Sequence, residues 1–152
     1  MKRNLWLSIA ILVFMLGSVS CNRQWEDPDT SIPSQTISIS NLISNRQAYT
    51  SAGVSLIGKV WDLKVQTAQN DDADGVPETY TTFILADRMG NGVDVYAKGD
   101  VPIQEGDFVR VVGIFRKEFQ PTGDYFLNVV DAVRIEDWKP GMVYWLREME
   151  FD

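Results

Sequence analysis

The fold of this chain is decided by residues 93–115, which read VDVYAKGDVPIQEGDFVRVVGIF. Apolar and polar residues alternate at both ends of the stretch, which predicts two strands that each bury one face. Val93, Val95 and Ala97 are expected on the buried face of the first of them. Between the strands lies an acidic segment, residues 99–107, that contains one proline and two glycines. These residues are typical of turns, so the stretch predicts two strands joined by a short corner.

The same alternation recurs on both sides of this stretch. Gly58 and Gly113 each interrupt an apolar run, where a strand must bend or bulge. The Asn-Gly pair at 91–92 predicts a tight turn with positive φ, and Ser40 is expected to cap a short helix before the first strand. Five strands are expected, over residues 53–67, 79–87, 93–98, 107–119 and 125–137. Short strands with frequent turns and little helix predict a small all-β barrel.

This order of elements resembles an OB-fold domain over about residues 53–137. The resemblance implies a five-stranded OB-like barrel with short flanking helices at its N- and C-terminal ends. The corner is also similar to that of the membrane-anchored haem chaperones of cytochrome c maturation, whose pattern is matched by Tyr96, Gly99, Pro102, Glu105, Gly106 and Gly113. The haem-attaching histidine of that family has no counterpart here, because the chain has no histidine. We therefore expect barrel architecture and no haem chaperoning, with a short connection at the corner where many OB domains carry a helix.

The N-terminus predicts export. Lys2 and Arg3 precede an apolar run over residues 5–17, and small residues then lead to Cys21. A basic start, a short apolar run and small residues are typical of a secretory signal peptide, here residues 1–20. The serine, valine, serine and cysteine at 18–21 resemble the lipobox of bacterial lipoproteins. That resemblance implies cleavage before Cys21 and lipidation of its thiol. The lipid would anchor the protein to the bacterial cell membrane or outer membrane, with the domain in the periplasm or outside the cell. The alternative is an ordinary signal peptide or an uncleaved anchor.

The remaining chain divides at its polar segments. Residues 21–36 are polar, contain two prolines and show no hydrophobic period, so we expect a flexible tether. Residues 37–137 then form the OB-fold domain. In residues 138–152, Met142, Trp145, Leu146 and Met149 share one face of a predicted helix. That helix either caps the barrel or docks on a partner protein.

One acidic loop is a candidate calcium site. Its residues 70–78 read NDDADGVPE, and the oxygen-bearing side chains alternate along them as in an aspartate-rich calcium loop. The expected ligands are Asn70, Asp72, Asp74, the carbonyl of Val76, and Glu78. Position 12 of such a loop is a threonine here, so the bidentate glutamate of an EF-hand is missing. The alternative is a solvated hairpin loop, and no other cofactor is expected.

The expected binding surface is the face that OB barrels use for recognition. It places five residues near a ligand, namely Trp61, Tyr80, Phe83, Asp94 and Tyr96. Residues 53–137 carry 8 basic and 15 acidic side chains, which disfavours a polyanionic ligand. The absence of histidine, and a lone cysteine at 21, argue against an enzyme. The sequence thus predicts a non-catalytic binding or assembly module for an envelope protein or small ligand. The alternative is nucleic-acid or oligosaccharide binding through the same face.

Overall fold

The computed structural model describes residues 32–68, 77–121 and 123–139, which form six strands and two short helices. Each of the five predicted strands is confirmed to within one residue at either end. The elements are β1 (Gln35–Thr36), α2 (Ile39–Ser44), α3 (Arg46–Tyr49), β2 (Gly53–Ala68), β3 (Glu78–Ala86), β4 (Gly92–Lys98), β5 (Phe108–Phe119) and β6 (Phe126–Asp137). No helix within the described ranges is long and apolar enough to cross a membrane.

The strands close into an OB-like barrel, which confirms the predicted fold class. The sheet runs in the order β1-β2-β3-β4-β6-β5, and β5 pairs back onto β2. Neighbouring strands are antiparallel except for two pairs, β4 with β6 and the short β1 with β2. A five-stranded closed sheet with this order is the OB topology. The two-residue strand β1, which the alternation did not predict, is an addition at the edge.

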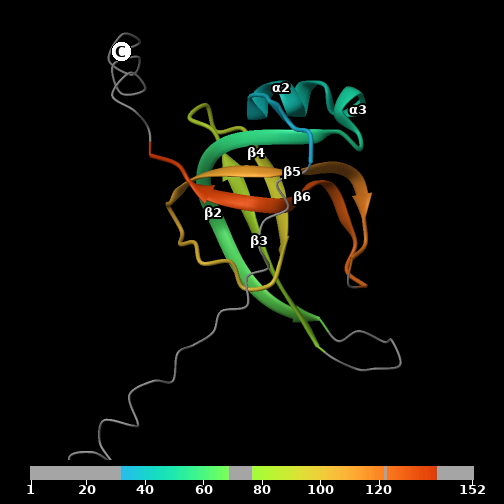
Figure 1. Ribbon diagram of the computed structural model, residues 1–152, viewed down its shortest axis with the longest axis vertical. Helices are drawn as coiled ribbons and strands as arrows, with labels where there is room; N and C mark the ends of the chain where they lie inside the picture. Colours follow the sequence, from blue (N-terminus) through green and yellow to red (C-terminus); the bar gives the residue numbers. More distant parts are fainter. Residues whose placement is uncertain (1–31, 69–76, 122, 140–152) are drawn as a thin grey trace, which may run out of the picture.

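Strand β2 closes the barrel because it bends. Its first half, Gly53–Lys59, pairs with β5, and its second half, Lys59–Ala68, pairs with β3 (Figure 1). Gly58 lies at the change of partner, and a Cβ there would approach the Ala86 carbonyl oxygen to 2.7 Å. Gly113 faces β6 at a register shift, and its Cβ would lie 2.3 Å from the Asp131 carbonyl oxygen. The close approaches explain both predicted mid-strand glycines.

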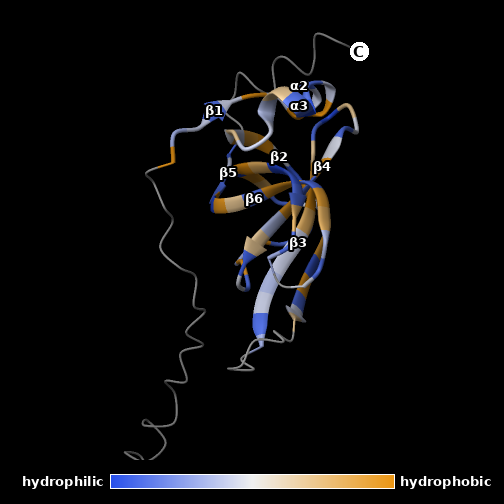
Figure 2. Cartoon of the chain, turned by 90° about the vertical axis from the view of Figure 1, so that its right-hand side faces the viewer, coloured by the Kyte–Doolittle hydropathy of each residue, from blue (hydrophilic) through white to orange (hydrophobic). Residues whose placement is uncertain are grey.

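The barrel interior is filled by alternate residues of every strand, as the period of two requires. Figure 2 shows hydrophobic residues along the strands of the barrel body. Ile39 and Leu42 of α2 close one end, where Figure 1 shows the helices above β2. The residues with almost no exposed surface include Val54, Leu56, Val60, Leu85, Val95, Val109, Val111, Phe115 and Val130. Val93, Val95 and Ala97, which were expected to share one face of β4, all pack in this core.

Two local predictions are wrong. Ser38, rather than Ser40, caps α2, because its side-chain oxygen accepts a hydrogen bond from the Asn41 amide at 3.2 Å. In the turn between β3 and β4, the residue with positive φ is Gly90 (φ 81°), rather than the Asn-Gly pair at 91–92. Asn91 does not have a positive φ, and its amide donates a hydrogen bond to the Asp87 carboxylate at 2.9 Å.

Candidate functional site

The candidate site lies on the outward surface of β2, β3 and β4, which we call the OB face. Residues paired across neighbouring strands point to the same side of a sheet. Trp61 pairs with Ile84 and Ile84 with Asp94, so these three side chains form one row across the face. A second row contains Lys64, Thr82 and Tyr96. A pocket of about 250 Å³ lies along these rows, lined by Asp62, Lys64, Thr82, Phe83, Ile84, Asp94, Val95, Phe126 and Val129.

One half of the OB face is open to solvent. We call it the open half and define it by Trp61, Asp62, Lys64, Thr82, Ile84 and Asp94. The Trp61 side chain is 50% exposed, and the Lys59 ammonium lies 5.2 Å from the centre of its ring. Asp94 is exposed, and none of the described residues forms an ion pair with it. The open half therefore offers an aromatic surface beside a free carboxylate.

The charges of the open half do not favour an anion. Lys64 is the cation of the pocket, and its ammonium lies 2.7 Å from an Asp62 carboxylate oxygen. This contact uses much of the positive charge that a phosphate would require. With Asp94 added, the pocket holds two carboxylates and one ammonium. The net charge of the pocket lining is thus negative, like the net charge of residues 53–137 as a whole.

The other half of the OB face is covered by the β5–β6 hairpin, and we call it the covered half. Its centre is Tyr96, whose ring stacks on Tyr80 with 5.3 Å between centroids. Phe119 and Phe126, which flank the loop of the hairpin, have ring centroids 5.2 and 5.5 Å from that of Tyr96. Tyr80 and Tyr96 are each only 3% exposed. We expected these two tyrosines near a ligand; the hairpin packs on them, so they expose little surface to one.

A hydrogen bond ties the loop of this hairpin to β3. The Tyr80 hydroxyl donates to the Asp124 carboxylate at 2.5 Å. Burial raises the pKa of Tyr80 to about 12, and the hydrogen bond and negative charge of Asp124 act in the same direction. The hydroxyl is therefore a fixed donor over the whole neutral range. The bond holds Asp124 close to the packed rings of Tyr80, Tyr96, Phe119 and Phe126.

A partly buried ion pair supports the covered half from β5 and β6. An Arg116 guanidinium nitrogen lies 3.4 Å from a carboxylate oxygen of Asp131. Burial raises the pKa of Asp131, and the neighbouring Arg116 opposes that shift. The same guanidinium lies 5.8 Å from the centre of the Phe119 ring. The pair thus links the sheet to an aromatic residue of the hairpin.

The Phe83 side chain belongs to the barrel interior, although the residue also lines the pocket on the OB face. It is 2% exposed and packs in the main core, because it follows Tyr80 by three positions and so points to the opposite side of β3. Of the five residues expected on the binding surface, Trp61 and Asp94 lie on the open half. Tyr80 and Tyr96 lie in the covered half. The prediction missed Asp62, Lys64, Thr82 and Ile84, and the last two could have been found from their alternation with Phe83.

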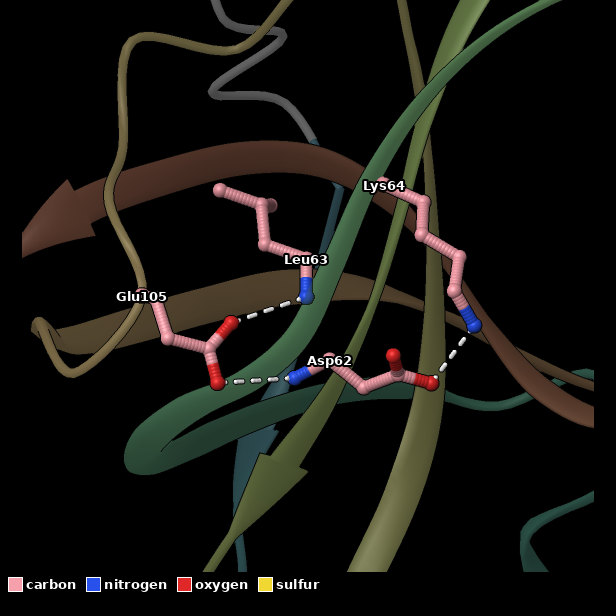
Figure 3. A network of polar contacts seen from close by, with 4 residues as sticks. All are labelled: Asp62, Leu63, Lys64 and Glu105. Carbon is pink, nitrogen blue, oxygen red and sulfur yellow. Dashed lines mark hydrogen bonds and ion pairs between the residues drawn. The ribbon is translucent and has the colours of Figure 1, made fainter.

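A bulge in β2 explains why Asp62 and Lys64 were missed. The register of β2 against β3 shifts between Trp61 and Lys64, so Asp62 and Leu63 share one partner position. Asp62 has a positive φ of 52°. The amides of Asp62 and Leu63 donate to the two carboxylate oxygens of Glu105, each at 3.0 Å. Figure 3 shows Glu105 on one side of β2 and the contact between Asp62 and Lys64 on the other.

Several predicted features lie outside the described residues. These are the signal peptide, Cys21 and most of the tether, the calcium-loop residues Asn70, Asp72, Asp74 and Val76, and residues 140–152 of the predicted C-terminal helix. Glu78 is described and begins β3, where its carboxylate lies 3.1 Å from the Lys98 ammonium. Across the ranges 32–68, 77–121 and 123–139, no group of three or more acidic, histidine or cysteine residues is arranged to hold a metal ion.

Comparison with known proteins supplies structural neighbours only. No family model and no curated protein matches the chain. Among solved structures, the OB domain of a Thermoplasma acidophilum protein matches with 22% identity and a TM-score of 0.47, over 72% of this chain and 92% of its own. The second OB-fold domain of replication protein A from Methanococcus maripaludis matches with 15% identity and a TM-score of 0.37, over 61% and 90%. The fold assignment rests on the strand order described above.

Proposed function

We propose that this chain is a non-catalytic binding module, held at a bacterial membrane through lipidated Cys21, that takes its partner on the open half of the OB face. The partner is a segment of an envelope protein or a small ligand. The observation that carries the proposal is the pocket beside half-exposed Trp61, which is lined by an exposed Asp94 carboxylate that pairs with none of the described residues. Pockets that combine apolar surface with a few convergent polar groups are typical of binding sites.

The chemistry of the pocket defines the ligand it suits. Carboxylates accept hydrogen bonds, so Asp62 and Asp94 favour a ligand rich in N–H or O–H donors. Trp61 offers a flat apolar surface on which a side chain or ring can pack. Among the residues that line the pocket, the carboxylates of Asp62 and Asp94 outnumber the Lys64 ammonium, so a neutral or positively charged group fits there better than an anion. Backbone amides and basic side chains of a protein segment meet these requirements.

Oligosaccharide binding is the second candidate, and the position of Trp61 next to Asp62 favours it. A sugar presents a flat apolar face and several hydroxyl donors, which match an indole ring beside carboxylates. Nucleic-acid binding is less well supported. The affinity for a polyanion depends on cations that replace its counterions, and Lys64 is already paired with Asp62 at 2.7 Å.

Site-directed photo-crosslinking tests the location of the binding surface. The full chain is expressed in a bacterium with a photoreactive amino acid in place of Trp61. In the control cells the same amino acid replaces Met89 instead. Met89 is 85% exposed and lies in the turn between β3 and β4, so it is an accessible control position. We expect a discrete crosslinked product from position 61 and none from position 89. Equal labelling at both positions, or none at either, would contradict the proposed protein partner.

Two titrations separate the ligand classes. Fluorescence anisotropy of a labelled single-stranded oligonucleotide, at low and moderate salt, reports on polyanion binding. We expect no binding at low salt, where phosphate contacts are strongest. Chitotetraose, a neutral oligosaccharide, is added in parallel while the indole signal of Trp61 is followed by NMR. A saturable shift of that signal that is lost in Asp94→Ala would favour the oligosaccharide over the protein segment.

The proposed anchor has its own test. Wild type and Cys21→Ala are compared by membrane fractionation, with acyl-chain labelling of the same cells. Lipidation predicts that the wild type is labelled and sediments with membranes, and that the variant is neither labelled nor retained. A variant that fractionates like the wild type would contradict this account of the anchor.

A further inference from the structure

We infer that Glu105, in the corner between β4 and β5, is the positioning residue that decides which side chains of β2 form the open half of the OB face. The part of the inference that concerns ligand binding rests on the function proposed above. Glu105 is not part of the pocket lining. It acts through the backbone of β2, which it contacts at the bulge shown in Figure 3.

The contact satisfies two backbone amides with one side chain. Both carboxylate oxygens of Glu105 accept a hydrogen bond at 3.0 Å, one from Asp62 and one from Leu63. A bulge leaves its extra residue outside the regular ladder of the sheet. Hydrogen bonds to a charged acceptor are about twice as strong as neutral ones. Glu105 therefore provides at the bulge the acceptors that a regular neighbouring strand would provide elsewhere.

The bulge has a direct consequence for the composition of the face. In a regular strand, residues three positions apart point to opposite sides. Trp61 and Lys64 are three apart, yet both pair with residues of the same side of β3, Ile84 and Thr82. The extra residue is what brings them to one side. Without it, either the indole or the ammonium would leave the pocket side of the sheet.

The conformation at Asp62 needs external support. Its φ of 52° lies in the left-handed region, which few residues other than glycine occupy, although aspartate tolerates it better than most. A G1 bulge usually places glycine at such a position. Here an aspartate occupies it, and its carboxylate is directed to Lys64. The hydrogen bonds that the Asp62 and Leu63 amides donate to Glu105 oppose the local preference for a regular strand.

The corner holds Glu105 in place for this role. The Gly106 amide donates to the Val60 carbonyl, and the Val60 amide donates to the Asp107 carbonyl, both at 2.9 Å. Within the corner, the Gln104 amide donates to the Asp107 carboxylate at 2.8 Å. The backbone on the C-terminal side of Glu105 is thus docked on β2 two residues before the bulge. The backbone that carries the Glu105 carboxylate is therefore held in place where it contacts the amides of Asp62 and Leu63.

The test compares three variants with the wild type, all as the ¹⁵N-labelled full chain in detergent micelles. Glu105→Ala removes both acceptors, and Glu105→Gln keeps one acceptor oxygen and so tests rescue by the closest side chain. Asp100→Ala is the matched control, because Asp100 is an exposed carboxylate of the same corner with no hydrogen bond or ion pair to any described residue. Amide exchange at Asp62 and Leu63 is measured together with side-chain NOEs between Trp61 and Ile84 and between Lys64 and Thr82.

The expected pattern is specific. In Glu105→Ala, exchange of the Asp62 and Leu63 amides accelerates roughly ten- to hundred-fold, which is the effect of losing one charge-assisted hydrogen bond each. The two NOE pairs are no longer observed together. Glu105→Gln gives intermediate exchange and retains both NOE pairs, and Asp100→Ala matches the wild type. Unchanged exchange and both NOE pairs in Glu105→Ala would overturn the inference.

Photo-crosslinking from position 61 then tests the link to binding. We expect the crosslinked product to decrease at least several-fold in Glu105→Ala and to persist in Asp100→Ala. A lost bulge with undiminished crosslinking would overturn the role of Glu105 in binding. If the wild type itself gives no product while the exchange pattern holds, the proposed function fails and the positioning role stands. The two failures are therefore distinguishable.

Discussion

Both halves of the OB face carry aromatic rings, and they differ in what covers those rings. The open half has one aromatic ring, Trp61, which is 50% exposed, whereas the covered half has Tyr80 and Tyr96, each 3% exposed. All three rings project from neighbouring strands on the same side of the sheet. The difference is the β5–β6 hairpin, which places Phe119 and Phe126 over the tyrosines and leaves the tryptophan free.

The comparison teaches that aromatic residues on a recognition face can serve two separate purposes. In the covered half they form a small second core outside the barrel, built on Tyr80, Tyr96 and Val129. In the open half the single indole is available to a ligand. A count of aromatic residues on the OB face would therefore overestimate its capacity to stack bases or sugars. Substitutions in the two halves should consequently affect different properties.

The largest expected difference is in stability. Tyr96→Ala removes the central ring of the covered half, and we expect it to lower the free energy of unfolding by about 3–5 kcal/mol, as for other buried aromatic truncations. Trp61→Ala, the control in the open half, should lower it by less than about 1 kcal/mol because half of the ring is already in water. Urea unfolding of both variants measures the two values. Equal losses would show that the hairpin does not create a second core.

A smaller effect is expected at the hydroxyl of Tyr80. Tyr80→Phe removes its bond to Asp124, and at pH 7 we expect a loss of about 1.5–3 kcal/mol, as for hydrogen bonds to charged groups. Tyr125→Phe removes a hydroxyl from an exposed residue of the same loop. The carboxylate that interacts with this hydroxyl, Glu118, is itself exposed, so we expect little effect at that pH.

The same variant has a predicted pH dependence. Tyr80 has a pKa of about 12 in the folded protein, above the ordinary value of about 10. Its stabilising contribution is therefore complete below pH 10 and is lost as the pH rises through the folded pKa. The stability difference between wild type and Tyr80→Phe should stay constant from pH 7 to 9 and decrease by pH 11. A difference that grows over that range would show that burial does not keep the hydroxyl protonated.

The smallest effect is expected for the ion pair of the open half. Asp62 and Lys64 are in contact at 2.7 Å, but both side chains are more than half exposed. Lys64→Ala should change the free energy of unfolding by less than about 1 kcal/mol, and by less still at high salt, because water and ions screen exposed pairs. Urea unfolding at low and high salt checks this. A large loss would place Lys64 with the structural residues of the face.

The barrel could be predicted from the sequence because its determinants are local. Alternation fixes the strands and their buried sides, and Gly58 and Gly113 report close backbone approaches within single strands. The cover over Tyr80 and Tyr96 was not predictable in this way. It depends on contacts between residues that are distant in the sequence. The hydrogen bond between Tyr80 and Asp124, for example, joins residues that are 44 positions apart. No periodicity within one strand contains that information.

The open half was only partly predictable, for a different reason. Trp61 and Asp94 were found because they lie outward in regular segments. Asp62 and Lys64 were missed because the residues around the bulge, which read VWDLKV at 60–65, carry no mark of an extra residue. The bulge is stabilised by Glu105, and the sequence prediction had assigned that glutamate only to a turn. Phe83 was misplaced because it was grouped with Tyr80 although the two lie on opposite sides of β3.

The pairing of β2 with β5 also sets how this domain must fold. Gly53 pairs with Ile114, so the closing contact joins residues that are 61 positions apart (114 − 53). Contacts between distant residues carry a larger loop-closure cost and slow the folding of all-β domains to milliseconds or seconds. Until β5 has been synthesised, the apolar first half of β2 lacks its antiparallel neighbour and presents a strand edge to other chains. Unpaired strand edges of this kind are prone to pair with other chains.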